Sequence, residues 1–239
     1  CRAIERRLPR IPAADHGEHA AGVRVLHDHA ALHRRNLAQR IAAIGGFGHR
    51  HDIADLLGHG HCSAEALAAR LGWPNAALMR HAKARGCTTT VDIFAGSAAD
   101  LPDVDAVLPY TDYFIPSVEE AHALTGLTDL DDMAAFFMDR GAGACVFTLG
   151  GDGAYYRDRK GLTFRIPAFN VDVRCTCGCG DVFNAGFATG LLNGMSPQDS
   201  VRLAQASSAL NATGLGSQAG VVSLPDTLEF MRRCSVRAA

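Results

Sequence analysis

The sequence predicts an α/β fold in which helices cover a layered sheet. From about residue 76 onward, short β-branched or apolar segments alternate with longer segments of helical pattern, an alternation that is typical of α/β sheets. Glycines also follow several of the predicted helices, at the position where they commonly end a helix. The chain has 239 residues, of which 48% are hydrophobic, and this is enough for one sizeable core.

The first regular elements are a helix and two strands. Asn75–Arg85 is predicted to be a helix that ends at Gly86. Thr88–Phe94 is rich in β-branched residues and therefore predicts a strand. Asp112–Ile115 predicts a second strand, which is short and buried.

Two helices are predicted next. Ser117 begins the first of them, and Glu120 follows three residues later, which fits a capping box. Gly126 ends this helix. Leu130–Arg140 is predicted to be the second helix, closed by Gly141.

The remaining elements are a strand, a hairpin and three helices. Cys145–Leu149 predicts an apolar strand that leads into a turn at Gly150–Gly153. Ala154–Arg157 and Leu162–Ile166 predict a hairpin. The predicted helices that complete the chain are Asp181–Leu192, Pro197–Ala212 and Asp226–Arg233.

Residues 1–75 do not continue this pattern. We expect Ala30–Ile44 to form an amphipathic helix and Ser63–Leu71 to form another, and no clear strand is predicted. An α/β domain of this kind normally begins with a strand. We therefore divide the chain into an unmatched segment, residues 1–75, that is either disordered or aberrant, and a regular domain over residues 76–239.

Composition excludes several classes of protein. The formal net charge is −2 with 20% charged residues, which gives no general bias towards nucleic acid or membrane surfaces. No apolar run approaches the roughly 18 residues of a spanning helix, and the first residues lack the apolar core of a secretory signal. The eight cysteines have no framework spacing, so we expect reduced thiols. A cytoplasmic protein that binds neither nucleic acid nor membranes is expected.

The strongest chemical signal is Gly178-Cys179-Gly180-Asp181 at the start of a predicted helix. Two glycines around a small residue allow successive backbone N–H groups to converge on one point, and the helix N-terminus adds partial positive charge. Such a point suits a phosphate or a phosphoryl group in transfer. A carboxylate there can take a proton from an attacking hydroxyl. The alternative is an ordinary N-capped helix after a tight turn.

The surrounding residues resemble the PfkB/ribokinase family of carbohydrate kinases. Cys175–Phe187 resembles its second fingerprint, Asp-Thr-Thr-Gly-Ala-Gly-Asp-x-Phe-x-Ala-Gly-Phe. Val146–Gly153 resembles its Val-Thr-Leu-Gly-x-x-Gly strand and turn, and Tyr113–Ala121 resembles its Asn-x-x-Glu helix. The resemblance covers about residues 76–233. It implies a ribokinase-like three-layer αβα sandwich, present mainly as its C-terminal, nucleotide-binding half.

The resemblance also implies roles for individual residues. Asp181 would be the base that activates a sugar hydroxyl, and the segment Gln205–Ser217 would line the adenine pocket. Glu120 would help to hold Mg²⁺ and its waters, a role that suits a carboxylate, although the capping box alone also explains it. The anion hole would consist of the backbone amides of Gly178, Cys179 and Gly180. The other residues near the nucleotide would be Thr148, Gly150, Gly153 and Ser117, of which Thr148 could equally be an ordinary strand-end threonine.

Two departures from the family pattern matter. Ser117 replaces the Asn of Asn-x-x-Glu, and Cys175 replaces the first Asp of the fingerprint. In many members this Asp helps to bind an activating monovalent cation, so its replacement argues against activation by such a cation. Cys175, Cys177 and Cys179 alternate as metal ligands can, but two of them stand where relatives have Thr and Ala. We therefore interpret them as small-residue replacements.

The sugar-binding strand and lid of the family are not recognisable in residues 1–75. We expect residues 1 to about 70 to be a truncated or out-of-frame start. The predicted function is ATP- and Mg²⁺-dependent phosphorylation of a sugar or polyol hydroxyl, with a homodimer possible where a lid is present. One alternative is a nucleotide-binding remnant without activity. Another is a His-rich metal-binding module fused to this domain, indicated by the pairs His27/His29, His49/His51 and His59/His61, the last of which is followed by Cys62.

Overall fold

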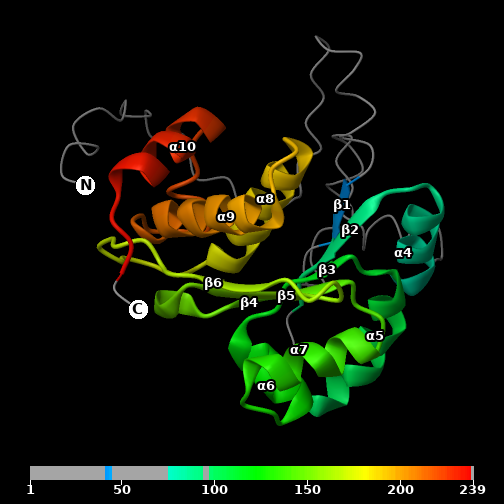
Figure 1. The fold of residues 1–239 in the computed structure, drawn as a ribbon. Helices are drawn as coiled ribbons and strands as arrows, with labels where there is room; N and C mark the ends of the chain where they lie inside the picture. Colours follow the sequence, from blue (N-terminus) through cyan, green and yellow to red (C-terminus); the bar gives the residue numbers. More distant parts are fainter. Residues whose placement is uncertain (1–40, 45–74, 94–96, 238–239) are drawn as a thin grey trace, which may run out of the picture.

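The computed structural model describes residues 41–44, 75–93 and 97–237. In this part of the chain a sheet is sandwiched between two layers of helices, as the sequence predicts (Figure 1). The strands are β1 (Ile41–Ile44), β2 (Thr88–Val91), β3 (Tyr113–Phe114), β4 (Ala144–Thr148), β5 (Ala154–Asp158) and β6 (Thr163–Ile166).

The strands pair in the order β1-β2-β3-β4-β5-β6. Neighbouring strands from β1 to β4 are parallel, whereas β5 and β6 are antiparallel to their neighbours. The carboxyl ends of β2, β3 and β4 therefore lie along one edge of the sheet. Open α/β sheets bind their ligands at this edge.

The helices match the predicted ranges to within two residues at nearly every end. They are α4 (Asn75–Ala84), α5 (Leu101–Val107), α6 (Val118–Thr125), α7 (Leu130–Asp139), α8 (Cys179–Leu192), α9 (Pro197–Ala212) and α10 (Leu224–Arg233). The sequence did not predict α5. It is a short segment that carries Pro102 and two aspartates, and burial of Val104 and Val107 holds it in place.

One prediction for the N-terminal segment is wrong. Ile41–Ile44 is a strand, not the end of a helix, and it pairs in parallel with β2. Its sequence, Ile-Ala-Ala-Ile, is a short apolar run whose period cannot separate a strand from a helix. The pairing with β2 decides between them. The helix predicted at Ser63–Leu71 lies outside the described residues, as do the three histidine pairs and Cys62.

Successive side chains of the central strands point to opposite faces of the sheet, and the hydrophobic core is therefore divided into a cluster on each face. In β4, Cys145 and Phe147 belong to the cluster beneath α4–α7, whereas Val146 belongs to the cluster beneath α8 and α9. Phe183 and Phe187 of α8 are buried in that second cluster. Because successive strand residues face opposite sides, one strand can serve both layers.

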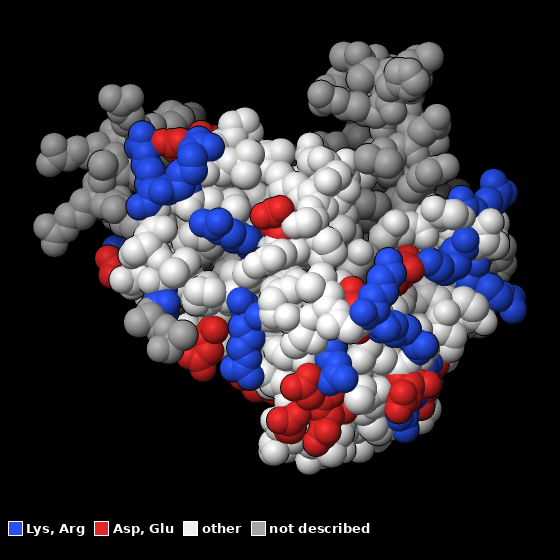
Figure 2. All heavy atoms as spheres, viewed as in Figure 1, with Lys and Arg blue, Asp and Glu red and all other residues white. Residues whose placement is uncertain are grey.

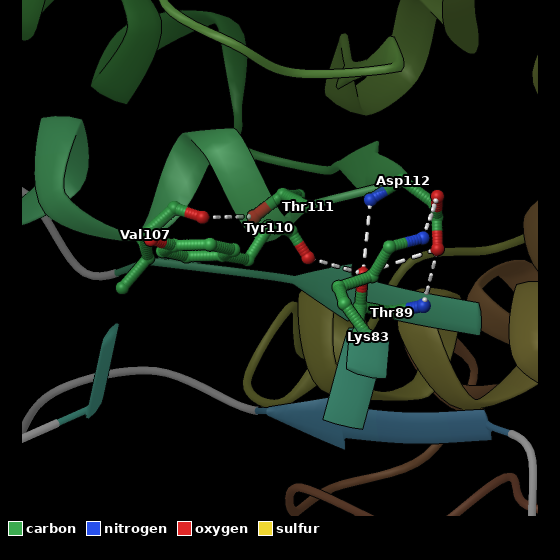
Figure 3. A network of polar contacts seen from close by, with 6 residues as sticks. All are labelled: Lys83, Thr89, Val107, Tyr110, Thr111 and Asp112. Atoms are coloured by element: carbon green, nitrogen blue, oxygen red, sulfur yellow. Dashed lines mark hydrogen bonds and ion pairs between the residues drawn. The ribbon is translucent and has the colours of Figure 1, made fainter. Parts of the chain in front are cut away.

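A polar network fixes α4 to the start of β2 and to the residues before β3 (Figure 3). Lys83 of α4 forms a 2.6 Å ion pair with Asp112. The second carboxylate oxygen of Asp112 accepts a hydrogen bond of 2.8 Å from the backbone N–H of Thr89. The Thr89 hydroxyl in turn donates to the carbonyl of Tyr110 at 2.6 Å. This network lies at the amino end of β2, opposite the edge that holds the candidate site.

The surface in Figure 2 carries blue and red side chains interspersed over several elements. This distribution agrees with the small net charge of −2. Among the described residues, no helix is both long enough and apolar enough to cross a membrane.

Candidate active site

The N-terminus of α8 begins on a glycine with a left-handed backbone. Gly178 is the N-cap residue, with φ 69°, and no side chain caps the helix. A Cβ atom at this position would lie 2.4 Å from the carbonyl oxygen of Ser217. Both the backbone conformation and the packing therefore require glycine. The loop before α8 consequently lies directly against the segment that the sequence assigns to the adenine pocket.

The three backbone amides predicted to form an anion hole lie together in this turn, but they are not equivalent. The N–H of Cys179 donates to the carbonyl of Thr176 at 3.1 Å. In the described part of the chain, the N–H groups of Gly178 and Gly180 have no such backbone acceptor. Unpaired N–H groups in the first turn of a helix attract anions. Two of the three amides are thus available to a ligand in this conformation.

Asp181 is the third residue of α8 and is exposed to solvent. It lies beside Gly180, where an added Cβ atom would be 3.8 Å from a carboxylate oxygen of Asp92. The negative charge of Asp181 contributes to the raised pKa of Asp92. The start of α8 therefore lies near the carboxylate of Asp92.

Asp92 is a candidate functional residue that the sequence analysis missed. It follows β2 directly and lies at the carboxyl edge of the sheet. Burial, and next the negative charge of Glu120, raise the pKa of Asp92 to about 7. A polar residue immediately after a β-branched strand was the available signal, because strand carboxyl ends collect ligand-binding residues in α/β sheets.

Asn184 lies one turn beyond Asp181 on α8 and faces Asp92. Its amide lowers the pKa of Asp92 and so opposes the effect of burial. The Asn184 side chain is only 8% exposed, and its amide atoms make no regular hydrogen bond with the described residues. Burying a side-chain amide without a hydrogen-bond partner destabilises a folded protein. A ligand bound at this point could form hydrogen bonds with the Asn184 amide.

Glu120 performs the capping role that the sequence predicts. Its carboxylate accepts a 2.8 Å hydrogen bond from the N–H of Ser117, and the Ser117 hydroxyl accepts one of 3.2 Å from the N–H of Glu120. The cap uses one carboxylate oxygen of Glu120, and the negative charge of Glu120 also acts on Asp92 and raises its pKa. Capping and metal binding are therefore compatible roles for this residue.

The residues predicted to lie near the nucleotide form two groups. Ser117 and Thr148 form an isolated parallel bridge, and the N–H of Thr148 donates to the carbonyl of Pro116 at 3.1 Å. Gly150 follows β4 and is exposed. Gly153 is buried, and a Cβ atom there would lie 1.9 Å from the carbonyl oxygen of Ile166. Hairpin packing is thus sufficient to explain Gly153, and its role near the nucleotide stays a prediction.

Over the described residues, no three His, Cys, Asp or Glu side chains are arranged as a ready metal site. This includes Cys175, Cys177 and Cys179. Asp92, Glu120 and Asp181 thus do not form a preformed cage of three ligands. A few carboxylates together with bound water suit Mg²⁺, which keeps much of its hydration shell in proteins.

Comparison with known proteins gives a consistent result. The model of the pfkB family of carbohydrate kinases matches residues 62–224, which is more than half of the chain. Ribokinase from Haemophilus influenzae is 35% identical over 132 residues, covering 53% of this chain and 43% of the relative. 2-Dehydro-3-deoxygluconokinase from Bacillus subtilis is 29% identical over 160 residues, covering 66% of this chain and 43% of the relative.

A solved structure shares the fold. Aminoimidazole riboside kinase from Salmonella enterica, in complex with aminoimidazole riboside and an ATP analog, superposes with a TM-score of 0.57 at 25% identity. The match covers 66% of this chain and 55% of that one. This chain therefore spans only about half the length of the proteins that it matches.

Proposed function

This chain belongs to the pfkB family of carbohydrate kinases, and we propose that it transfers the γ-phosphoryl group of ATP to a hydroxyl of a sugar or related polyol. The observation that carries this proposal is the turn at Gly178–Asp181. There, a helix N-terminus, an exposed carboxylate and two N–H groups with no backbone acceptor among the described residues meet within four residues. Phosphoryl transfer is catalysed by positioning and by electrostatic stabilisation of the phosphoryl oxygens, and this turn offers groups for both.

The backbone amides of Gly178 and Gly180 would receive the charge that spreads over the phosphoryl oxygens. Their position at the start of α8 adds the partial positive charge of the helix. Donors fixed in advance act without reorganisation during the reaction. The Cys179 amide would contribute only after releasing the carbonyl of Thr176.

Asp181 would accept the proton of the attacking hydroxyl. Its side chain is exposed, so a substrate can reach it. It also follows the amides directly in sequence, so a hydroxyl held beside it would face the phosphoryl group. General-base assistance of this kind contributes about 10²–10⁴ in rate.

Asp92 and Glu120 would hold Mg²⁺, with Asn184 facing the same point. The negative charges of Asp92 and Glu120 repel each other, which helps to raise the pKa of Asp92. A bound cation would offset this repulsion. Mg²⁺, when bound, neutralises charge on the nucleotide phosphates. The carboxylates of Glu120 and Asp92 would position it, directly or through water.

The adenine ring would lie along the end of α9 and the loop after it. The side-chain amide of Asn211 donates to the carbonyl of Cys177 at 3.1 Å, and Ser217 contacts Gly178. These contacts fasten the segment to the phosphate turn. Leu215 in the same loop is 76% exposed, which leaves apolar surface for a base.

A second candidate is a nucleotide-binding remnant without transfer activity. It is favoured by the limited length of the match. The chain matches only 43% of the length of the ribokinase from Haemophilus influenzae and 43% of that of the 2-dehydro-3-deoxygluconokinase from Bacillus subtilis. The chain would then bind ATP but lack the part that selects the sugar.

Two measurements separate these candidates. Titration calorimetry with ATP and Mg²⁺ tests nucleotide binding, and a coupled assay of ADP release against pentoses, hexoses, sugar acids and nucleosides tests transfer. Binding together with sugar-dependent ADP release supports the kinase. Binding without release from any acceptor supports the remnant, and the absence of ATP binding contradicts both.

A further inference from the structure

Cys175 and Cys177 form a thiol pair immediately before the phosphate turn. The backbone N–H of Cys177 donates to the sulfur of Cys175 at 3.3 Å. The side chain of Cys177 and the backbone of Gly216 also act on the Cys175 thiol, and both lower its pKa. The Cys175 sulfur thus lies in a polar environment, on a side chain that is not fully buried.

These contacts favour the thiolate form of Cys175. The side chain of Cys177 and the backbone groups of Cys177 and Gly216 lower the pKa of Cys175, and the same side-chain contact raises the pKa of Cys177. One residue therefore has the character of an attacking thiolate and its exposed neighbour that of a resolving thiol. Thiolate character, access and a nearby second cysteine together mark oxidation-sensitive sites.

Cys179 does not share this environment. Its thiol donates to the carbonyl of Ser208 at 3.6 Å, and its sulfur accepts a contact of 3.8 Å from the side-chain amide of Asn211. Both partners lie on α9, so the Cys179 thiol is engaged by that helix. The pair is thus Cys175 and Cys177.

We propose that Cys175 and Cys177 are a modification site that hydrogen peroxide oxidises to a disulfide at the edge of the phosphate turn. The Cys175 thiolate attacks one peroxide oxygen, which forms a sulfenic acid and releases hydroxide. The Cys177 thiol then attacks the Cys175 sulfur, which forms the S–S bond, and the sulfenic oxygen leaves as water. Peroxide gains the two electrons that the two thiols lose.

The spacing of the pair permits this bond. Residues separated by one position lie at most about 7 Å apart at Cα, and disulfides join Cα atoms about 4.4–6.8 Å apart. The contact between the Cys177 N–H and the Cys175 sulfur shows that the chain already bends between them. A disulfide in so small a ring is strained, and strained disulfides are readily reduced. The modification is therefore reversible.

The bond would disturb the phosphate turn through Thr176. The carbonyl of Thr176 accepts the N–H of Cys179, and the carbonyl of Cys177 accepts the amide of Asn211. Drawing the two sulfurs together moves the peptide groups between them and so shifts the start of α8. This effect on ATP binding rests on the proposed function, whereas the oxidation itself does not.

The positions of the arginines in the sequence allow the oxidation state of these cysteines to be measured on a single peptide. Trypsin cleavage after Arg174 and Arg202 releases one peptide that holds Cys175, Cys177 and Cys179 and no other cysteine. The reduced chain is treated with hydrogen peroxide, its free thiols are alkylated, and the peptide is fragmented. The variants are Cys177→Ser, which removes the resolving thiol, and Cys87→Ser, a control cysteine at the opposite end of β2.

In the wild type and in Cys87→Ser we expect a peptide that has lost two hydrogens, with Cys175 and Cys177 protected from alkylation and Cys179 alkylated. In Cys177→Ser we expect sulfenic or sulfinic acid on Cys175 and no disulfide. Dithiothreitol should restore the wild-type peptide. ATP with Mg²⁺ should slow the oxidation severalfold, because bound phosphate shields Cys175 and its charge disfavours the thiolate.

The inference is overturned if Cys175 remains alkylatable after peroxide treatment, or if the bond forms between Cys177 and Cys179 instead. The peptide readout is decisive whether or not the chain binds ATP. Failure of ATP to bind the reduced chain, with the disulfide still formed, would count against the proposed function alone.

Discussion

Asp92, Glu120 and Asp181 come from three separate segments, and their charges meet at the carboxyl edge of the sheet. Asp181 and Glu120 could be identified from the sequence because each lies in a local motif, the glycine turn and the capping box. Asp92 could not be recognised in this way. Its importance depends on strand pairing, which brings it beside α6 and α8, and no local pattern encodes that pairing.

The raised pKa of Asp92 predicts how stability depends on pH. Its pKa is about 7 in the folded chain, whereas an unperturbed aspartate has a pKa of 3.8, so folding takes up a proton between these pH values. Without a bound cation, stability should fall as pH rises from about 4 to 7 and then level off. Each pKa unit corresponds to about 1.4 kcal/mol, so the fall should not exceed a few kcal/mol.

Urea unfolding in EDTA at several pH values checks this expectation. Asp92→Asn should flatten the decline, because its side chain does not titrate. Mg²⁺ should restore stability above pH 7 in the wild type and do so less in the variant. A wild-type profile that rises over the same interval would show that Asp92 ionises normally.

Glu120→Gln separates the capping role of this residue from metal binding. A Gln at the third helical position still accepts from the N–H of Ser117, as in other capping boxes. The free energy of unfolding should therefore change by less than about 0.5 kcal/mol, while Mg²⁺-dependent ATP binding weakens. Ser117→Ala, the comparison variant, should cost about 1 kcal/mol of stability through loss of the cap. Equal loss of stability in both variants would mean that the carboxylate of Glu120 serves the helix cap and would leave no evidence for a separate role in metal binding.

At the scale of elements, the sequence predicted what depends on neighbours along the chain and missed what depends on distant partners. Most helices from α4 onward and the β5–β6 hairpin were predicted because their caps, glycines and periodicity are local. α5 was missed because its stability comes from burying Val104 and Val107 rather than from its composition. β1 was assigned wrongly because only its pairing with β2 distinguishes it from a helix.

The close packing of α8 against α9 gives a prediction at this scale. A Cβ atom on Gly186 would lie 2.9 Å from the Cα atom of Ala204, and a backbone atom cannot move aside as a flexible side chain can. Gly186→Ala should therefore destabilise the chain by about 1–3 kcal/mol, as overpacking does. Ala185→Ser, on the exposed side of the same helix, should change stability by less than about 0.5 kcal/mol. Chemical denaturation measures both, and unchanged stability of Gly186→Ala would mean that the helices lie further apart.

At the scale of the whole molecule, the sheet connects the two helical layers and places the phosphate turn opposite the carboxylates. α8 supplies Asp181 from one layer, whereas Glu120 lies in the first turn of α6 in the other. Ligands that bridge the edge should therefore stabilise the entire described domain, not one layer. The alternating pattern predicted a sheet covered by helices, and the family resemblance implied three layers. The pairing of residues 41–44 with β2 could not be predicted from either.

Thermal unfolding with nucleotide tests this bridging. ATP with Mg²⁺ at 100 times its dissociation constant should add about 2.7 kcal/mol to the stability of the folded chain. ATP in EDTA should add less, since Asp92 and Glu120 would then repel the phosphates. Identical melting temperatures with and without nucleotide would contradict a nucleotide site at this edge.

The base assignment of Asp181 is the central claim, and one comparison tests it most directly. Asp181→Asn is compared with Asp199→Asn, which makes the same change at the third position of α9, at the far end of the α8–α9 pair. Transfer of labelled γ-phosphate from ATP to a sugar acceptor, together with ATP affinity, is measured for both variants. Asp181→Asn should keep ATP affinity nearly intact and lose at least about 100-fold in transfer rate, while Asp199→Asn retains both. Near-full transfer by Asp181→Asn would contradict the account.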